Sequence, residues 1–268
     1  MSILVATNFS KLSDNAVLYA ASLAKQFNTK LIIFNAFKLP IHAANSRLSA
    51  NSLDVFIEIN RQKLKKITKE IKQKFNVETE FKCRFSTLED EIEELMTLYK
   101  ARFLVIGMSP KSMEQNLLGN PTTTLISLKR FPVLAIPIKA KFTGLKKILF
   151  ACDLLDDIPL KKLVKLRQIA VELKSDVTVF YVDKRIDNMK TITNDSIDRG
   201  LNEVTLLYKN VKSKTVLEEI KKEIEKSKSE LLVMIPKKYG FWESLLHKSK
   251  TREMASGLDI PLFSISIE

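Results

Sequence analysis

Three short apolar segments of this chain occur twice, in the same order. Their positions are residues 3–8, 103–106 and 131–136 in the first half and residues 148–153, 231–234 and 260–265 in the second half. The paired sequences read ILVATN and ILFACD, FLVI and LLVM, FPVLAI and IPLFSI. Matched segments in a constant order indicate two copies of one structural unit. The 268 residues leave about 135 for each copy, which is an ordinary domain size.

Within each copy, short runs of β-branched and aromatic residues alternate with longer segments of helical periodicity. In the first copy we expect strands at residues 3–7, 31–37, 79–85, 103–106 and 133–136, and helices at 12–27, 53–75, 88–99 and 121–128. In the second copy we expect strands at residues 148–151, 177–182, 204–208, 231–235 and 262–267, and helices at 160–173, 216–226 and 241–254. Such alternation predicts parallel sheets with helices on both faces.

The net charge of +13 is compatible with a polyanionic partner, but a solvated surface explains it better. Six lysines of the expected helix at residues 53–75 fall opposite its apolar side, as on a helix that faces water. No nucleic-acid-binding motif accompanies the basic residues. We therefore do not expect nucleic acid as a partner.

Targeting and metal-binding signals are not found in the sequence. Residues 1–8 read as a core strand rather than a signal peptide, and no run approaches the roughly 18 apolar residues that cross a bilayer. Cys83 and Cys152 have neither a CxxC partner nor a nearby His, so we expect two buried thiols and no metal site. These observations predict a cytoplasmic protein without a membrane span.

The segments that end the first and fourth strands resemble the universal stress protein family. The matching segments of the first copy are TNFS at residues 7–10, VIG at 105–107, LLG at 117–119 and FPVL at 131–134. Those of the second copy are LLVM at 231–234, FWESLLHKS at 241–249 and IPL at 260–262. The chain is similar to a tandem member, with domains at residues 1–138 and 147–268, the second shorter and degenerate. The resemblance implies two Rossmann-like (adenine nucleotide alpha hydrolase-like) α/β domains, each a five-stranded parallel sheet flanked by helices.

The resemblance also implies a nucleotide site in the first copy. Members that bind ATP share a Gly-x-x-Gly loop, a nine-residue gap and a Gly-Ser/Thr pair, together with an Asp that ends the first strand and contacts adenine. Carried over to this chain, the nucleotide site would comprise Asn8, Ala36, Gly107, Gly119 and Asn120, with Asn8 in place of the Asp and Asn120 in place of the Ser/Thr. Pro110 replaces the second glycine, and it has no N–H to offer a phosphate.

The second copy departs further from that pattern. Asp153 and Ser249 remain, but Pro236, Tyr239 and His247 occupy the region of the three glycines. We expect this loop to be closed to a triphosphate.

Two hypotheses about function stay open. In the first, the chain is a cytoplasmic stress-response binding protein whose first copy keeps weak affinity for ATP or AMP and whose second copy is structural. In the second, it is a protein-interaction module that binds no nucleotide. No arrangement of residues favours catalysis, so we do not expect an enzyme.

The resemblance has one more implication, for assembly. Residues 133–136 and 262–267 would lie antiparallel and join the two copies as an internal pseudo-dimer. Further association into a homodimer and an unknown protein partner are left open by the sequence.

Overall fold

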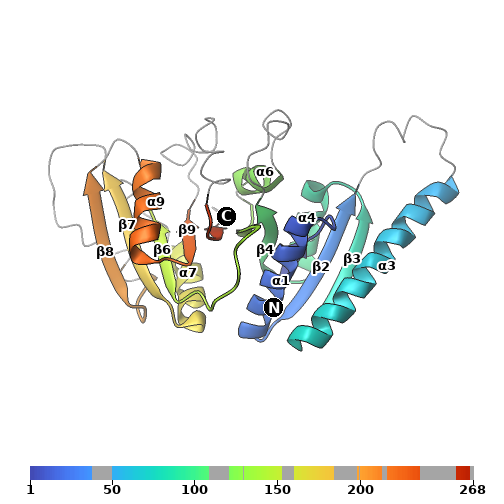
Figure 1. Cartoon of the computed structure of the whole chain (residues 1–268), viewed down its shortest axis with the longest axis horizontal. Helices are drawn as coiled ribbons and strands as arrows, with labels where there is room; N and C mark the ends of the chain where they lie inside the picture. Colours follow the sequence, from blue (N-terminus) through green and yellow to red (C-terminus); the bar gives the residue numbers. More distant parts are fainter. Residues whose placement is uncertain are drawn as a thin grey trace. The chain divides into compact units, whose positions relative to one another are not determined.

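The computed structural model describes a large part of the chain, namely residues 1–37, 50–108, 121–128, 130–152, 160–183, 198, 200–212, 216–235 and 258–265. The chain divides into two compact units, Met1–Gly107 and Met108–Glu268. Both units are built from parallel strands with helices packed against them, as predicted (Figure 1). Each unit is described in turn.

In its described residues, the first unit is a parallel sheet with three helices. Its elements are β1 (Ser2–Ala6), α1 (Lys11–Gln26), β2 (Lys30–Phe37), α3 (Ala50–Phe75), β3 (Thr79–Phe85), α4 (Leu88–Leu98) and β4 (Ala101–Met108). The strands are ordered β3-β2-β1-β4, and all pairs with a described register are parallel. Strand β1 is therefore hydrogen-bonded on both sides, and all five of its residues are buried.

Helix α1 begins with a capping box. The Ser10 hydroxyl accepts a hydrogen bond from the Ser13 N–H, and the Ser13 hydroxyl in turn accepts one from the Ser10 N–H. These two bonds satisfy N–H groups that have no partner within the helix. The apolar side of the helix, which includes Ala16, Ala20 and Leu23, is buried, and α1 packs on β1 and β2.

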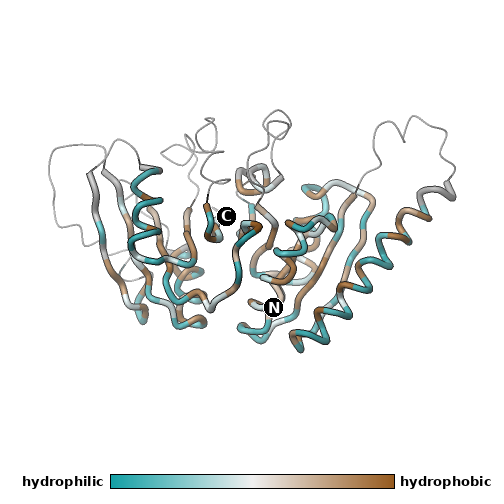
Figure 2. Tube along the Cα trace, in the orientation of Figure 1, coloured by the Kyte–Doolittle hydropathy of each residue, from teal (hydrophilic) through white to brown (hydrophobic). Residues whose placement is uncertain are grey.

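Helix α3 packs on β3 and β2. Leu64 and Ile71 on its inner side are buried, whereas the lysines between residues 63 and 74 are exposed, as predicted. Figure 2 shows hydrophilic and hydrophobic residues alternating along this helix. Burial of the apolar side, rather than the intrinsic preference of a lysine-rich helix, holds α3 to the sheet.

The second unit contains the remaining elements. They are α6 (Pro121–Leu128), β5 (Val133–Pro137), β6 (Lys147–Ala151), α7 (Leu160–Leu173), β7 (Asp176–Asp183), β8 (Leu206–Lys212), α9 (Val216–Ser227), β9 (Leu231–Met234) and β10 (Leu262–Ser264). Its strands are ordered β5-β10-β9-β6-β7-β8. Strands β10, β9, β6, β7 and β8 are parallel and correspond to the five strands expected for the second copy.

The antiparallel pairing predicted for the last strands is confirmed. Strand β5 runs antiparallel to β10, with Val133 opposite Ser264, Leu134 opposite Phe263 and Ala135 opposite Leu262. The closing strand of the first copy is thus grouped with the strands of the second, which is why the compact units divide at Gly107. The boundaries of the sequence repeat, 1–138 and 147–268, stay a prediction.

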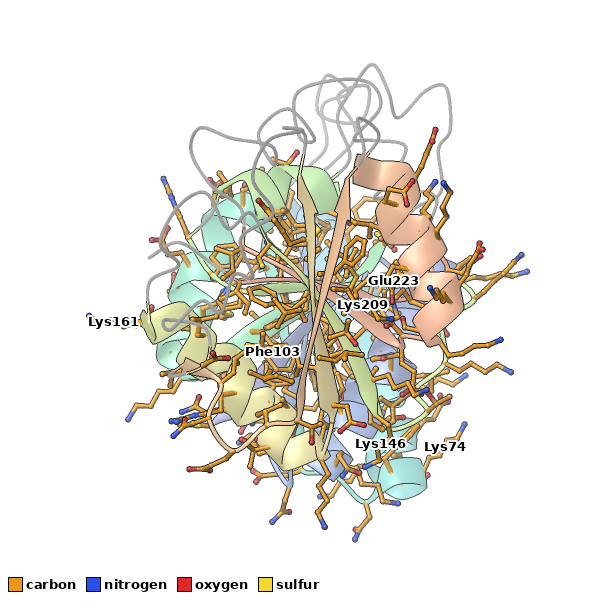
Figure 3. All side chains as sticks on the ribbon, turned by 90° about the vertical axis from the view of Figure 1, so that its left-hand side faces the viewer. Lys74, Phe103, Lys146, Lys161, Lys209 and Glu223 are labelled. Carbon is orange, nitrogen blue, oxygen red and sulfur yellow. The ribbon has the colours of Figure 1, made fainter. Side chains whose placement is uncertain are left out.

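Two carboxylates, one half-buried and one buried, fix local contacts in the second unit. The side chain of Glu230 accepts hydrogen bonds from the Thr143 hydroxyl and from the N–H groups of Lys146 and Lys147, which fixes the start of β6. Lys209 of β8 forms an ion pair with Glu223 of α9 (Figure 3). Because Glu223 is buried, this pair ties the helix to one particular strand.

Some predicted bounds are wrong. Strand β8 begins at Leu206, two residues later than expected, and continues to Lys212. It continues past Tyr208 because its main chain stays paired with β7 as far as Lys212 opposite Asp183. Helix α3 begins at Ala50, three residues early. The helix expected at residues 241–254 lies outside the described residues.

The cysteines are less buried than predicted. Cys83 and Cys152 are both half-buried, and neither forms a disulfide. Cys83 lies on β3, the last strand in the order of its unit, where one side of the strand has no neighbour in that unit. Partial burial is still enough to raise the pKa of its thiol. Separately, none of the helices in the described part of the chain combines the length and apolarity required to cross a membrane.

Substituting Leu4 tests the importance of β1. Leu4→Ala removes a fully buried side chain, and we expect it to lower the free energy of unfolding by about 2–5 kcal/mol. Leu98→Ala is the matched control, because Leu98 is 59% exposed and its truncation should cost less than about 1 kcal/mol. Denaturant titration measures both. Equal losses in the two variants would contradict the central position of β1.

Candidate functional site

Three of the five residues expected at a nucleotide site lie together at the carboxyl edge of the first unit. Val5 of β1 lies opposite Val105 of β4, and Ala6 lies opposite Phe34 of β2. Asn8, Ala36 and Gly107 each follow two or three residues later, so they reach the same edge on three neighbouring strands. This edge, where the connections diverge on either side of the first strand, is where open α/β sheets bind ligands.

The other expected residues lie outside the described part of the chain. These are Gly119 and Asn120, with Pro110 between the fourth strand and α6, and in the second copy Asp153, Pro236, Tyr239, His247 and Ser249. The complete five-residue site therefore stays a prediction.

The turn after β1 is closed by hydrogen bonds to side chains. The Asn8 and Ser10 N–H groups both donate to the Ser13 hydroxyl, at 3.3 and 3.0 Å, and the Phe9 N–H donates to the Thr7 hydroxyl at 3.1 Å. The Thr7 and Ser13 hydroxyls are themselves hydrogen-bonded at 3.1 Å. All three N–H groups of residues 8–10 are thus occupied. An anion at this turn would have to displace one of these bonds before the backbone could hold it.

Asn8 presents a donor where the family pattern has an acceptor. Its side-chain oxygen accepts hydrogen bonds from the Ser10 hydroxyl at 2.6 Å and the Ser10 N–H at 3.2 Å. This fixes the orientation of the amide, because the opposite orientation would set its NH₂ group against an N–H donor. Asn8 is exposed, so its NH₂ group is accessible from solvent. An amide NH₂ pairs with acceptor atoms, whereas an aspartate at this position would accept from an amino group.

Asn35 is a residue of this site that the sequence interpretation missed. It is 3% exposed, and its side-chain NH₂ donates to the Thr7 carbonyl at 2.7 Å, next to the main-chain bond from the Thr7 N–H to the Phe34 carbonyl. Its Oδ1 atom is buried without a hydrogen-bond partner. Turning the amide over would set that oxygen against the Thr7 carbonyl, so the donor contact decides the orientation. The signal for Asn35 in the sequence is a single amide within the apolar run LIIFNAF.

Gly107 has a packing role that requires no ligand. A β-carbon at this position would lie 2.6 Å from Leu12 Cγ and 3.1 Å from the Leu12 carbonyl oxygen. The missing side chain lets α1 approach β4 closely, as glycine often does where a helix packs on a strand. Ala36, by comparison, is half-buried on β2 opposite Arg84.

Phe9 connects the turn to a groove between α1 and α3. Its φ of 62° lies in the left-handed region, which is unusual for a bulky residue. The Lys63 ammonium lies 5.1 Å from the centre of its ring, within range of a cation–π interaction. The groove, which we call the α1–α3 groove, has a volume of about 410 Å³. Its lining residues are Phe9, Asp14, Val17, Leu18, Lys63, Lys66, Ile67, Glu70 and Ile71.

Comparison with known families matches the first copy to a family model. The sequence model of the universal stress protein family matches residues 1–137, slightly more than half of the chain. The chain belongs to the universal stress protein family. No protein among the curated sequences matches it.

Solved structures extend the likeness in fold to the whole chain. A universal stress protein from Archaeoglobus fulgidus DSM 4304 is similar with a TM-score of 0.74 and 14% identity, over 99% of this chain and 96% of that one. The cytoplasmic domain of a prokaryotic cation chloride cotransporter is similar with a TM-score of 0.57 and 10% identity, over 99% and 95% of the two chains. At these identities the likeness shows the fold alone. The same fold therefore serves proteins of different kinds.

A third structure is a universal stress protein in complex with cAMP. It is 23% identical, with a TM-score of 0.40, over 51% of this chain and 96% of that one. The geometric likeness is too low to assign its ligand to this chain.

Substitution of Asn35 tests its role at the end of β1. Asn35→Asp places a buried carboxylate against the Thr7 carbonyl, so desolvation should raise its pKa in the folded state. Above the pKa that this carboxyl has in the unfolded chain, the variant should therefore have a lower free energy of unfolding, by about 3 kcal/mol at pH 7. This loss shrinks as the pH falls, because the protonated acid can donate a hydrogen bond to the Thr7 carbonyl. Asn35→Leu should cost a similar amount at every pH. Denaturant titrations at pH 4 and pH 7 check this, and a pH-independent loss in Asn35→Asp would contradict it.

Proposed function

We propose that this universal stress protein is a non-catalytic binding protein whose first copy holds the base of ATP or AMP weakly. The observation that supports this is the convergence of Asn8, Ala36 and Gly107 at the carboxyl edge of the sheet. Weak affinity follows from the closed turn, since the N–H groups of residues 8–10 are already bonded to side chains. Because this turn offers a phosphate no free N–H group, ATP and AMP should bind with similar affinity.

The proposal keeps three expectations from the sequence. The protein acts in the cytoplasm in the response to stress, it is not an enzyme, and its second copy is structural. We also infer that the two copies form an internal pseudo-dimer, an arrangement supported by the antiparallel pairing of β5 with β10.

The second candidate function is a protein-interaction module that binds no nucleotide. The internal hydrogen bonds of the turn favour it, as does the reversed polarity of Asn8. One experiment separates the two candidates, because only the first predicts a response to nucleotide.

Thermal unfolding with and without nucleotide provides that test. A ligand at ten times its Kd stabilises the folded state by about 1.4 kcal/mol, so ATP and AMP at 5–10 mM should each raise the melting temperature by a few degrees. Magnesium chloride and inorganic triphosphate at equal ionic strength serve as controls. No shift with either nucleotide would leave the interaction module as the function.

Asn8→Asp is the matching variant at the base position. A carboxylate can accept a hydrogen bond from the amino group of adenine, whereas the NH₂ of Asn8 cannot. We expect this variant to bind AMP several-fold more tightly, measured by calorimetric titration. Unchanged AMP binding in Asn8→Asp would show that the base is held elsewhere.

A further inference from the structure

The α1–α3 groove is lined by both apolar and charged side chains. Val17 and Ile71 among them are buried, and helices α1 and α3 contact each other. Of the charged residues that line it, Asp14, Lys63, Lys66 and Glu70, none forms an ion pair with another side chain in the described part of the chain. The groove is thus a concave surface whose charges are not neutralised by one another.

Exposed apolar side chains extend the groove along α3. Phe56 is 43% exposed and Ile59 is 46% exposed. Together with Lys63 and Lys66 they are spaced by three or four residues, so they lie along one side of the helix. Across the groove, Leu18 of α1 is 41% exposed. Large apolar side chains gathered around a groove are typical of an interaction surface.

The length of α3 accounts for this exposure. Its 26 residues span about 39 Å as a helix, whereas the eight residues of β2 span about 26 Å. The helix is therefore longer than the neighbouring strand by roughly 13 Å, about two and a half turns. Because Leu64 and Ile71 are buried against the sheet, the excess lies at the N-terminal end that carries Phe56 and Ile59.

The charge beside the groove is strongly positive. Between residues 61 and 75, α3 carries a single carboxylate, Glu70. The cations of this segment are Arg61, Lys63, Lys65, Lys66, Lys69, Lys72 and Lys74. Two of these cations, Lys63 and Lys66, line the groove together with the carboxylates Asp14 and Glu70, and neither lysine has an ion-pair partner in the described part of the chain. An acidic partner would supply counter-charges for these two lysines while its apolar side covered the groove.

We propose that the α1–α3 groove binds an acidic amphipathic helix of a partner protein. Such a helix places apolar residues spaced by three and four into the groove against Phe9, Leu18 and Ile59, and its carboxylates reach Lys63 and Lys66. A flat bilayer does not enter a groove between two helices. A nucleic acid would neutralise the lysines but leave Phe56 and Ile59 exposed to water. The proposal holds whether or not the first copy binds a nucleotide.

A designed peptide tests the proposal on the full chain. The probe is an 18-residue fluorescein-labelled helix with leucines spaced by three and four and glutamates elsewhere, and its twin carries lysine at every glutamate position. We expect the acidic peptide to bind at 150 mM salt, by fluorescence anisotropy, and the basic twin not to bind. No binding of the acidic peptide at 100 µM protein would overturn the proposal.

Matched variants show whether binding uses the groove. Lys63→Glu combined with Lys66→Glu should weaken binding at least tenfold. Lys65→Glu combined with Lys72→Glu changes the net charge equally on the same helix, but neither residue lines the groove, so it should weaken binding less than threefold. Equal losses in both variants would mean diffuse attraction to net charge, and the proposal would be wrong.

Apolar variants and a membrane arm complete the test. Ile59→Ser with Leu18→Ser should weaken binding at least fivefold, whereas Leu98→Ser, on an exposed residue of α4, should not. Circular dichroism verifies that each variant is folded. If phosphatidylserine vesicles sediment the protein through Lys63 and Lys66 while the peptide does not compete, the surface binds lipid and the proposal is overturned.

Discussion

The first unit depends on the burial of β1 between two parallel neighbours. Every residue of Ser2–Ala6 is buried, so this strand can neither shift its register nor leave the sheet without exposing a continuous apolar run. Its main chain then ends at one defined place. The end of β1 fixes the positions of the turn at Thr7, the first residue of α1 and the candidate site.

The Ser13 hydroxyl shows how closely helix capping and ligand binding compete at this place. It completes the capping box of α1 and also accepts from the N–H of Asn8. The N–H groups of this turn are bonded to the side chains that begin the helix, so they are not free to bind an anion. Asn35 strengthens the same arrangement from β2 by holding the Thr7 carbonyl. The site is therefore rigid, but it has few groups to spare for a phosphate.

Much of the fold could be predicted because short β-branched and apolar runs mark strands and a period of 3.6 residues marks helices. Strand β3 and helices α6 and α7 have the predicted bounds, and β1 begins and ends one residue earlier than predicted. The end of β8 could not be predicted, since Lys209, Asn210 and Lys212 are paired through their main chain, which leaves no mark in the side-chain pattern. Hydrogen bonding along a ladder depends on a neighbour that is distant in the sequence.

The contacts at the candidate site were harder to predict, because they too depend on residues that are distant in the sequence. Family resemblance pointed to Gly107 as a residue near phosphate but gave no indication that Leu12 of α1 packs where its β-carbon would lie. The contact between Asn35 and Thr7 depends on the register of β1 against β2, which the sequence does not specify. A glycine or an amide in a strand indicates that another group of the protein or a ligand lies close to the strand, but it does not identify that group.

The pairing of β10 on both of its sides has a consequence for aggregation and assembly. An unpaired strand presents a row of free main-chain donors and acceptors to which another chain can add. Strand β10 has only three residues, yet β9 and β5 cover both of its flanks, so it presents no such row. The backbone of the chain itself therefore occupies both flanks of β10, and a second molecule cannot add a strand there.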